Sequence, residues 1–245
     1  MQRRYETIYS PAVGRDVQIL AYGHYGYPLI AFPSGGGAFH DFEDNGMIEA
    51  ISWLINDGKV KVYCPESLDN ESWLSDNDPH WKAVRHNDYE AFINYDLVPA
   101  IRYDCGDDDI KIGLTGCSIG AYHAVNFALK FPHMFPYALG MSGRYDVEKL
   151  AGYSDSQDVY FNNPIAYAAN FEGGHLDYVR DNAHIALVCG QGAWEDKSLE
   201  ETNRLADVLA AKGISHERDL WGYDVEHHWH WWRQQFTHHI GRALG

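Results

Sequence analysis

Short apolar runs alternate with amphipathic helical patterns along most of the chain, from about residue 28 onward. Such alternation is typical of a mostly parallel sheet that is covered by helices. The pattern predicts strands at 16–22, 28–32, 60–64, 110–115, 137–141, 185–189 and 217–221. It predicts helices at 47–55, 81–103, 119–130, 199–212 and 229–244, with an irregular segment from the end of the 137–141 strand to about residue 182.

The 245 residues contain no internal repeat, low-complexity tract or Pro/Ser-rich linker. This length fits one large α/β domain or two small ones, and without a linker a single domain over residues 1–245 is the simpler interpretation. The chain has 19 Lys and Arg residues and 35 Asp and Glu residues, which gives a formal charge of −16. That charge disfavours nucleic acid as a partner, because phosphate binding needs clustered cations.

Two long stretches without charged residues, 17–40 and 112–129, are interrupted by glycines, prolines or polar side chains. Neither resembles a membrane-spanning helix, and no apolar run follows the arginines near the N-terminus. We therefore expect a cytoplasmic protein with no membrane partner. The four cysteines are widely spaced and form no CxxC pair, so we expect free thiols, mostly buried.

The first candidate for chemistry is the pentapeptide Gly-Cys-Ser-Ile-Gly at 116–120, between a predicted strand and a predicted helix. A strand, a sharp turn and a helix are what a nucleophile elbow requires, because the glycines let the backbone turn and expose the serine hydroxyl. Ser118 is thus the candidate nucleophile. The alternative is a tight turn in which Ser118 only caps the helix.

A glycine run, Ser34-Gly35-Gly36-Gly37, follows the predicted strand at 28–32. Backbone without side chains can direct N–H groups at the negative charge that develops on an attacked carbonyl. Gly35 and Gly36, together with the N–H of Ile119, are the expected oxyanion hole. The alternative is a flexible turn.

A base is expected after the final strand, where His227, His228 and His230 lie. Surface or packed imidazoles are the plainer interpretation. A metal site formed by His228, His230 and Glu226, with His238 or His239, is a further alternative, although no HExxH or finger spacing is present. We therefore expect neither a metal nor another cofactor.

The third catalytic group should be a carboxylate on the loop after the strand at 185–189, where Glu195 and Asp196 are adjacent. The order serine, acid, histidine is that of α/β-hydrolases. Each acid taken singly could instead be a solvated group or a charge at the start of a helix.

Taken together, the segments 32–36, 42–47, 115–124, 159–164 and 227–233 resemble the putative-esterase family of α/β-hydrolases, the group with esterase D-like enzymes, feruloyl esterases and mycolyltransferases. The chain is most similar to a branch of small, single-domain bacterial esterases. In that branch the last motif usually reads His-Asp-Trp-x-Trp-Trp-Arg, so the resemblance implies that His227 is catalytic. His228 stands where the branch has Asp. The resemblance also favours Glu195 over Asp196, because the branch tends to carry an acid directly after Gly-Ala-Trp.

The expected activity is hydrolysis of small, short-chain carboxylic esters by a cofactor-free Ser-His-acid triad, through an acyl-enzyme. Only about 40 residues separate the strands at 137–141 and 185–189, so at most a small lid is expected. Acyl transfer or thioester hydrolysis on the same triad remain alternatives. So does a catalytically silent α/β-hydrolase fold that serves as a binding module.

Overall fold

A computed structural model describes all residues from 1 to 245, and its eight strands form one sheet in the order β1-β2-β4-β3-β5-β6-β7-β8. The strands are β1 (Arg3–Ser10), β2 (Arg15–Tyr22), β3 (Tyr27–Phe32), β4 (Val60–Pro65), β5 (Gly113–Cys117), β6 (Tyr137–Met141), β7 (His184–Cys189) and β8 (His216–Leu220). From β4 to β8 every neighbouring pair is parallel. Only β1 and β2 run antiparallel to their neighbours.

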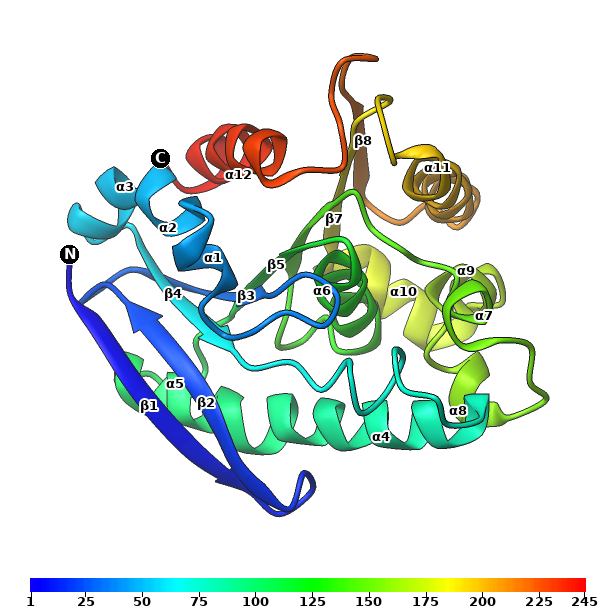
Figure 1. Cartoon of the computed structure of the whole chain (residues 1–245), viewed down its shortest axis with the longest axis horizontal. Helices are drawn as coiled ribbons and strands as arrows, with labels where there is room; N and C mark the ends of the chain where they lie inside the picture. The colour runs from blue at the N-terminus through cyan, green and yellow to red at the C-terminus, as the bar shows by residue number, and fades with distance from the viewer.

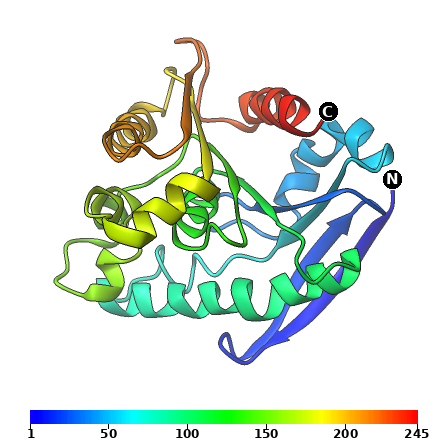
Figure 2. The same ribbon diagram turned by 180° about the vertical axis from the view of Figure 1, so that it is seen from behind.

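Helices cover both faces of this sheet (Figures 1 and 2). They are α1 (Asp41–Asp44), α2 (Met47–Ala50), α3 (Ser52–Asn56), α4 (Pro79–Phe92), the π-helical η1 (Ile93–Leu97), α5 (Val98–Cys105), α6 (Ile119–Lys130), α7 (Val147–Ala151), α8 (Gln157–Tyr160), α9 (Pro164–Ala169), α10 (Gly173–Asn182), α11 (Asp196–Ala211) and α12 (Trp229–Leu244). None of them is long and apolar enough to cross a membrane.

Strand β3 shows why both faces are covered. Its residues 29–32 are all fully buried and alternate between two hydrophobic cores. Ile30 and Phe32 face the core that is formed with α4, α6 and α11, whereas Leu29 and Ala31 face the core formed with α1 to α3 and α12. A central parallel strand that is apolar on both sides requires this three-layer arrangement. The predicted architecture, a mostly parallel central sheet flanked by helices, is therefore confirmed.

The predicted strands and the last helix are found, with shifts of a few residues, but two features differ at the N-terminal side. The sequence pattern missed β1, which is an edge strand of mostly exposed residues, three of them charged, and so lacks an apolar alternation. The predicted helix at 47–55 is two short helices. Ile51 lies between them with φ −115° and ψ 17°, outside the helical region, and is fully buried.

The predicted helix at 81–103 is longer, 79–105, and is interrupted by η1. Pro99 lies just after η1, near the start of α5. Its ring carries no N–H and would collide with the preceding turn of a regular α-helix, so the wider π turn accommodates it.

The segment after β6 that was expected to be irregular contains α7 to α10. Its apolar side chains, including Ile165, Leu176 and Val179, pack into the larger core. It therefore covers the sheet and forms no large lid. All four cysteines are free, as expected, and three of them are buried; Cys105 is half-buried.

Helix α12 has an uncommon cap. His228 is its N-cap residue, and the Nδ1 atom of its ring accepts a hydrogen bond of 3.1 Å from the N–H of His230. The imidazole thus caps the helix at the position where the resemblance implies Asp. Asp, Asn and Ser are the preferred N-cap residues because their short side chains reach these free N–H groups directly, and a negative charge also favours the helix N-terminus.

We therefore expect His228→Asp to raise the free energy of unfolding by about 0.5–1 kcal/mol. Chemical denaturation of both proteins measures this difference. Removal of the acceptor in His228→Ala should have the opposite effect. Equal or lower stability of His228→Asp would show that the imidazole does more than cap α12.

Candidate active site

Four segments that carry the candidate groups begin at the carboxyl ends of the neighbouring parallel strands β3, β5, β6 and β7. Gly35 follows β3, Ser118 follows β5, Ser142 follows β6 and Glu195 follows β7. In an open parallel sheet, the carboxyl ends of the strands form the crevice in which ligands bind. The topology therefore brings these residues to one edge of the sheet.

Ser118 lies in a strained turn between β5 and α6, with φ 57° and ψ −116°. The flanking positions 116 and 120 must be glycine, because neither has room for a Cβ atom. A Cβ on Gly120 would lie 2.3 Å from the carbonyl oxygen of Pro33, and a Cβ on Gly116 would lie 2.3 Å from the backbone of Gly120. The Ser118 side chain makes no capping hydrogen bond. The turn therefore has the geometry of a nucleophile elbow.

Three of the predicted residues lie in one line of contacts. Ser118 Oγ is 3.1 Å from His227 Nε2, and His227 Nδ1 is 3.1 Å from Glu195 Oε2. Glu195 is fully buried, and the side chain of His227 is 21% exposed. Asp196, the alternative acid, is the exposed first residue of α11, so the structure does not bring it to the imidazole.

Ser142 holds the other oxygen of Glu195 and was not singled out by the sequence. Its hydroxyl donates a hydrogen bond of 2.5 Å to Glu195 Oε1 and accepts one of 3.0 Å from the indole N–H of Trp232 on α12. The indole N–H of Trp232 thus orients the Ser142 hydroxyl, and that hydroxyl in turn holds the carboxylate of Glu195 in place. The available signal was its place directly after β6, at the carboxyl edge of the sheet.

Two buried thiols adjoin these groups. Burial, and then the charge of Glu195, raise the pKa of Cys189, whose Sγ lies 3.5 Å from Glu195 Oε2. Burial also raises the pKa of Cys117, the residue before Ser118, well above its usual value. Both thiols therefore stay protonated, and Cys117 does not compete with Ser118 as a nucleophile.

The oxyanion candidates differ in availability. The N–H groups of Gly35 and Ile119 have no hydrogen-bond partner within the protein. These residues are adjacent, because a Cβ on Gly35 would lie 2.7 Å from Ile119 Cδ1. The N–H of Gly36 instead donates to Asp69 Oδ2 at 3.3 Å. The N–H of Gly36 is thus already engaged, whereas those of Gly35 and Ile119 remain free to donate.

Positive φ angles at residues other than glycine occur at three positions, Ser118, Ser142 and Trp194. All three belong to this site: Ser118 contacts His227, Ser142 contacts Glu195, and Trp194 precedes Glu195 in the chain. Such conformations are unfavourable for residues with a Cβ and concentrate at functional sites.

The histidine cluster does not assemble the alternative metal site. His228 caps α12, and the ring of His230 contacts Gln234 on the surface. The residues that do have ligand spacing are Glu217, Asp219 and His239, between β8 and α12. Their carboxylates are already engaged, since Arg242 pairs with Glu217, and Trp221 and His239 contact Asp219.

A cavity of about 370 Å³ opens above the line of contacts. Its walls are Ser34, Gly35, Leu74, Ser118, Ile119, His227, His228, Trp229 and Trp232. No residue of the segment 144–183 contributes to it. A larger cavity, of about 610 Å³, lies at the opposite ends of β3 and β4, where Lys61 pairs with Asp104. The smaller cavity is the candidate active site, because it holds the free N–H groups and the serine.

Residues 10–243 match the family described as Putative esterase, whereas no curated protein matches. The fold is similar to that of a ferulic acid esterase, with a TM-score of 0.77, 16% identity and coverage of 100% of this chain and 98% of that one.

It is also similar to an S-formylglutathione hydrolase from Agrobacterium tumefaciens, with a TM-score of 0.74, 14% identity and coverage of 99% and 95%. A third similar structure is MPT51 (FbpC1) from Mycobacterium tuberculosis, with a TM-score of 0.73, 16% identity and coverage of 99% and 98%. The chain belongs to the putative esterase family and is a carboxylic ester hydrolase with the α/β-hydrolase fold.

Proposed function

We propose that the protein hydrolyses small carboxylic esters through an acyl-enzyme, with Ser118 as nucleophile, His227 as base and Glu195 as the acid that orients the base. The continuous line of contacts from Ser118 Oγ through His227 to Glu195 carries this proposal. Each atom has the partner that its role requires, because Nε2 faces the hydroxyl and Nδ1 faces the carboxylate.

In this mechanism Ser118 Oγ attacks the acyl carbon while its proton passes to His227 Nε2. The former carbonyl oxygen becomes negative and accepts hydrogen bonds from the N–H groups of Ile119 and Gly35. The C–O bond to the alcohol then breaks, and His227 returns the proton to the departing alcohol oxygen. Water, deprotonated by His227, attacks the acyl-enzyme, and Ser118 recovers its proton as the acid leaves.

Glu195 stabilises the imidazolium that forms in both steps. Its carboxylate is fully buried, and Oε1 already accepts the hydrogen bond from the Ser142 hydroxyl. Oε2 is therefore the oxygen that faces the imidazole. A buried carboxylate interacts more strongly with a neighbouring positive charge than an exposed one does. A catalytically silent binding module would have no need for this aligned set.

Covalent labelling tests the role of Ser118. We expect a fluorophosphonate probe to modify the native protein, and peptide mapping should place the adduct on Ser118. Ser118→Ala should remain folded, lose the label and lose nearly all ester hydrolysis, since only binding and oxyanion stabilisation remain. An adduct on another residue, or full activity of folded Ser118→Ala, would contradict the proposal.

The two adjacent acids provide a matched pair of variants. We expect Glu195→Gln to lower kcat by about 1,000-fold or more, because the amide no longer stabilises the imidazolium and favours the wrong tautomer. Asp196→Asn should change kcat by less than about 3-fold, since its side chain is exposed and away from the imidazole. Steady-state kinetics at saturating ester measures both. The reverse order would move the orienting role to Asp196.

The size of the cavity predicts the acyl preference. Its apolar wall consists of four side chains, those of Leu74, Ile119, Trp229 and Trp232, and no lid segment extends it. We therefore expect kcat/KM for p-nitrophenyl acetate and butyrate to exceed that for the palmitate, because a long chain would remain in water. A series of esters of increasing chain length measures this. A steady rise toward palmitate would show an acyl site that the cavity does not account for.

A further inference from the structure

A second buried carboxylate–histidine pair, Asp69 and His123, lies beneath the active site and takes no part in the mechanism above. Asp69, on the loop after β4, and His123, on α6, are both completely buried. Asp69 Oδ1 accepts a hydrogen bond of 2.8 Å from His123 Nε2, and Asp69 Oδ2 accepts one of 3.3 Å from the N–H of Gly36. A carboxylate is costly to bury, so its two partners indicate what it holds.

The first partner belongs to the loop that carries the free N–H of Gly35. Asp69 holds the peptide between Gly35 and Gly36, and the side chains of its neighbours hold the rest of this loop. Asn70 Nδ2 donates to the carbonyl of Gly36 at 3.3 Å, and Ser67 Oγ donates to that of Gly37 at 3.3 Å. Three consecutive glycines have great conformational freedom, so this loop needs external contacts to keep one conformation.

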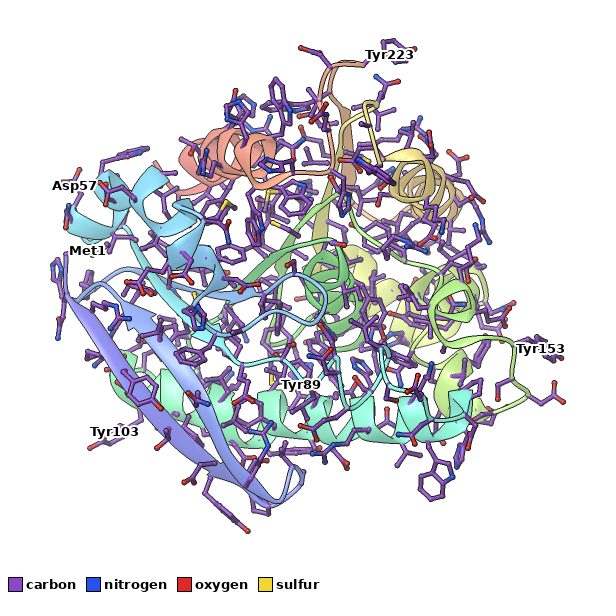
Figure 3. All side chains as sticks on the ribbon, viewed as in Figure 1. Met1, Asp57, Tyr89, Tyr103, Tyr153 and Tyr223 are labelled. Atoms are coloured by element: carbon purple, nitrogen blue, oxygen red, sulfur yellow. The ribbon has the colours of Figure 1, made fainter.

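The second partner belongs to the helix that begins at the elbow. His123 lies five residues after Ser118, in the first turns of α6. Its ring is enclosed by Phe32, Tyr89, Phe127 and the parallel ring of His86, at centroid distances of 5.2–5.9 Å. Figure 3 shows Tyr89 rising from α4 into the interior. The imidazole therefore has little freedom to move.

The tautomer of His123 follows from its contacts. Nε2 faces Asp69 and must donate, whereas Nδ1 is buried with no hydrogen-bond partner. A proton on Nδ1 would be an unpaired buried donor, which is more costly than an unpaired acceptor. The ring thus serves as a fixed donor to Asp69.

We propose that Asp69, held by His123, is a positioning residue for ester hydrolysis: it fixes the Gly35–Gly36 peptide relative to α6 and so keeps the N–H of Gly35 beside that of Ile119. This inference rests on the proposed function. The pair connects the two segments that supply the oxyanion donors, the loop after β3 and the start of α6, which lie side by side in Figure 1. Asp69 does not line the cavity, so it would act through the backbone that it holds.

Asp69→Asn tests this role. The amide keeps the shape of the carboxylate, but its single oxygen can accept from only one of the two donors, and its NH₂ group opposes the other. With p-nitrophenyl acetate we expect kcat to fall by about 10- to 100-fold, because a displaced donor loses much of its effect on the transition state. KM should change by less than about 3-fold, since ground-state binding does not depend on the oxyanion donors.

A transition-state analogue separates this role from a general loss of structure. A trifluoromethyl ketone adds to the serine and places a negative oxygen in the oxyanion hole, so its Ki should rise by about the same factor as kcat/KM falls. Rates are expressed per active site titrated with a fluorophosphonate. A lower Tm with unchanged kcat per titrated site would overturn the inference.

Two variants of His123 form a matched pair, and they also serve if Asp69→Asn does not fold. His123→Gln places an amide N–H near the position of Nε2, so kcat should stay within about 5-fold of the native value. His123→Phe fits the aromatic surroundings but removes the donor, and kcat should fall by about 10-fold or more. Equal kcat values for the two variants would contradict the proposed role.

Asp104→Asn is the control for loss of a paired carboxylate elsewhere. Asp104 accepts hydrogen bonds from Arg4 and Tyr63 at the other end of the sheet, so this change should lower Tm and leave kcat within about 2-fold. If the native protein hydrolyses no ester, the proposed function fails and the inference fails with it. If it does, and Asp69→Asn keeps kcat within about 2-fold, the inference alone is wrong.

Discussion

The active site depends on the close backbone approach of α6 to the loop after β3. Gly120 lies against the carbonyl oxygens of Phe32 and Pro33, with no room for a Cβ, and Gly116 lies against Gly120 in the same way. This contact forces the sharp turn at Ser118. The same contact places Gly35 beside Ile119. The positions of the nucleophile and of the two free N–H groups are therefore all set by this one close approach of the backbone.

Each side of the site is supported by helices from a different layer. On the acid side, Trp232 of α12 holds Ser142, and Ser142 holds Glu195. On the oxyanion side, the support comes from α6 on the opposite face of the sheet. Loops that carry chemistry gain precision from such contacts with rigid elements. At the tip of the loop after β8, Tyr223 projects into solvent (Figure 3).

The sequence predicted the parts of the site that have strong local signals. Ser118 lies in a pentapeptide whose glycines are needed by the turn itself, and His227 and Glu195 follow the last strands in the expected order. The local pattern alone did not separate Glu195 from Asp196, and only the resemblance favoured Glu195. The difference depends on where α11 begins: the residue before the helix turns inward, and the first helical residue faces solvent.

Residues that act through other residues had no such signal. Ser142 and Asp69 are common polar residues in irregular segments, and their partners lie 53 and 54 positions away in the chain. Strand β1 was missed for a related reason, since it is stabilised by backbone pairing with β2 and buries little apolar surface. The periodicity of apolar residues predicts which positions are buried. It does not predict polar contacts between residues that only the tertiary fold brings together.

The left-handed backbone of Ser118, Ser142 and Trp194 has a consequence for how the site meets a substrate. Each such residue costs on the order of 1–3 kcal/mol, and this cost is met during folding by the packing around it. Glycine would adopt these angles more easily, but it would also let each loop sample other shapes. The free energy of folding has therefore already been used to shape the pocket. An incoming ester meets groups that need little rearrangement, and its binding energy remains available for the transition state.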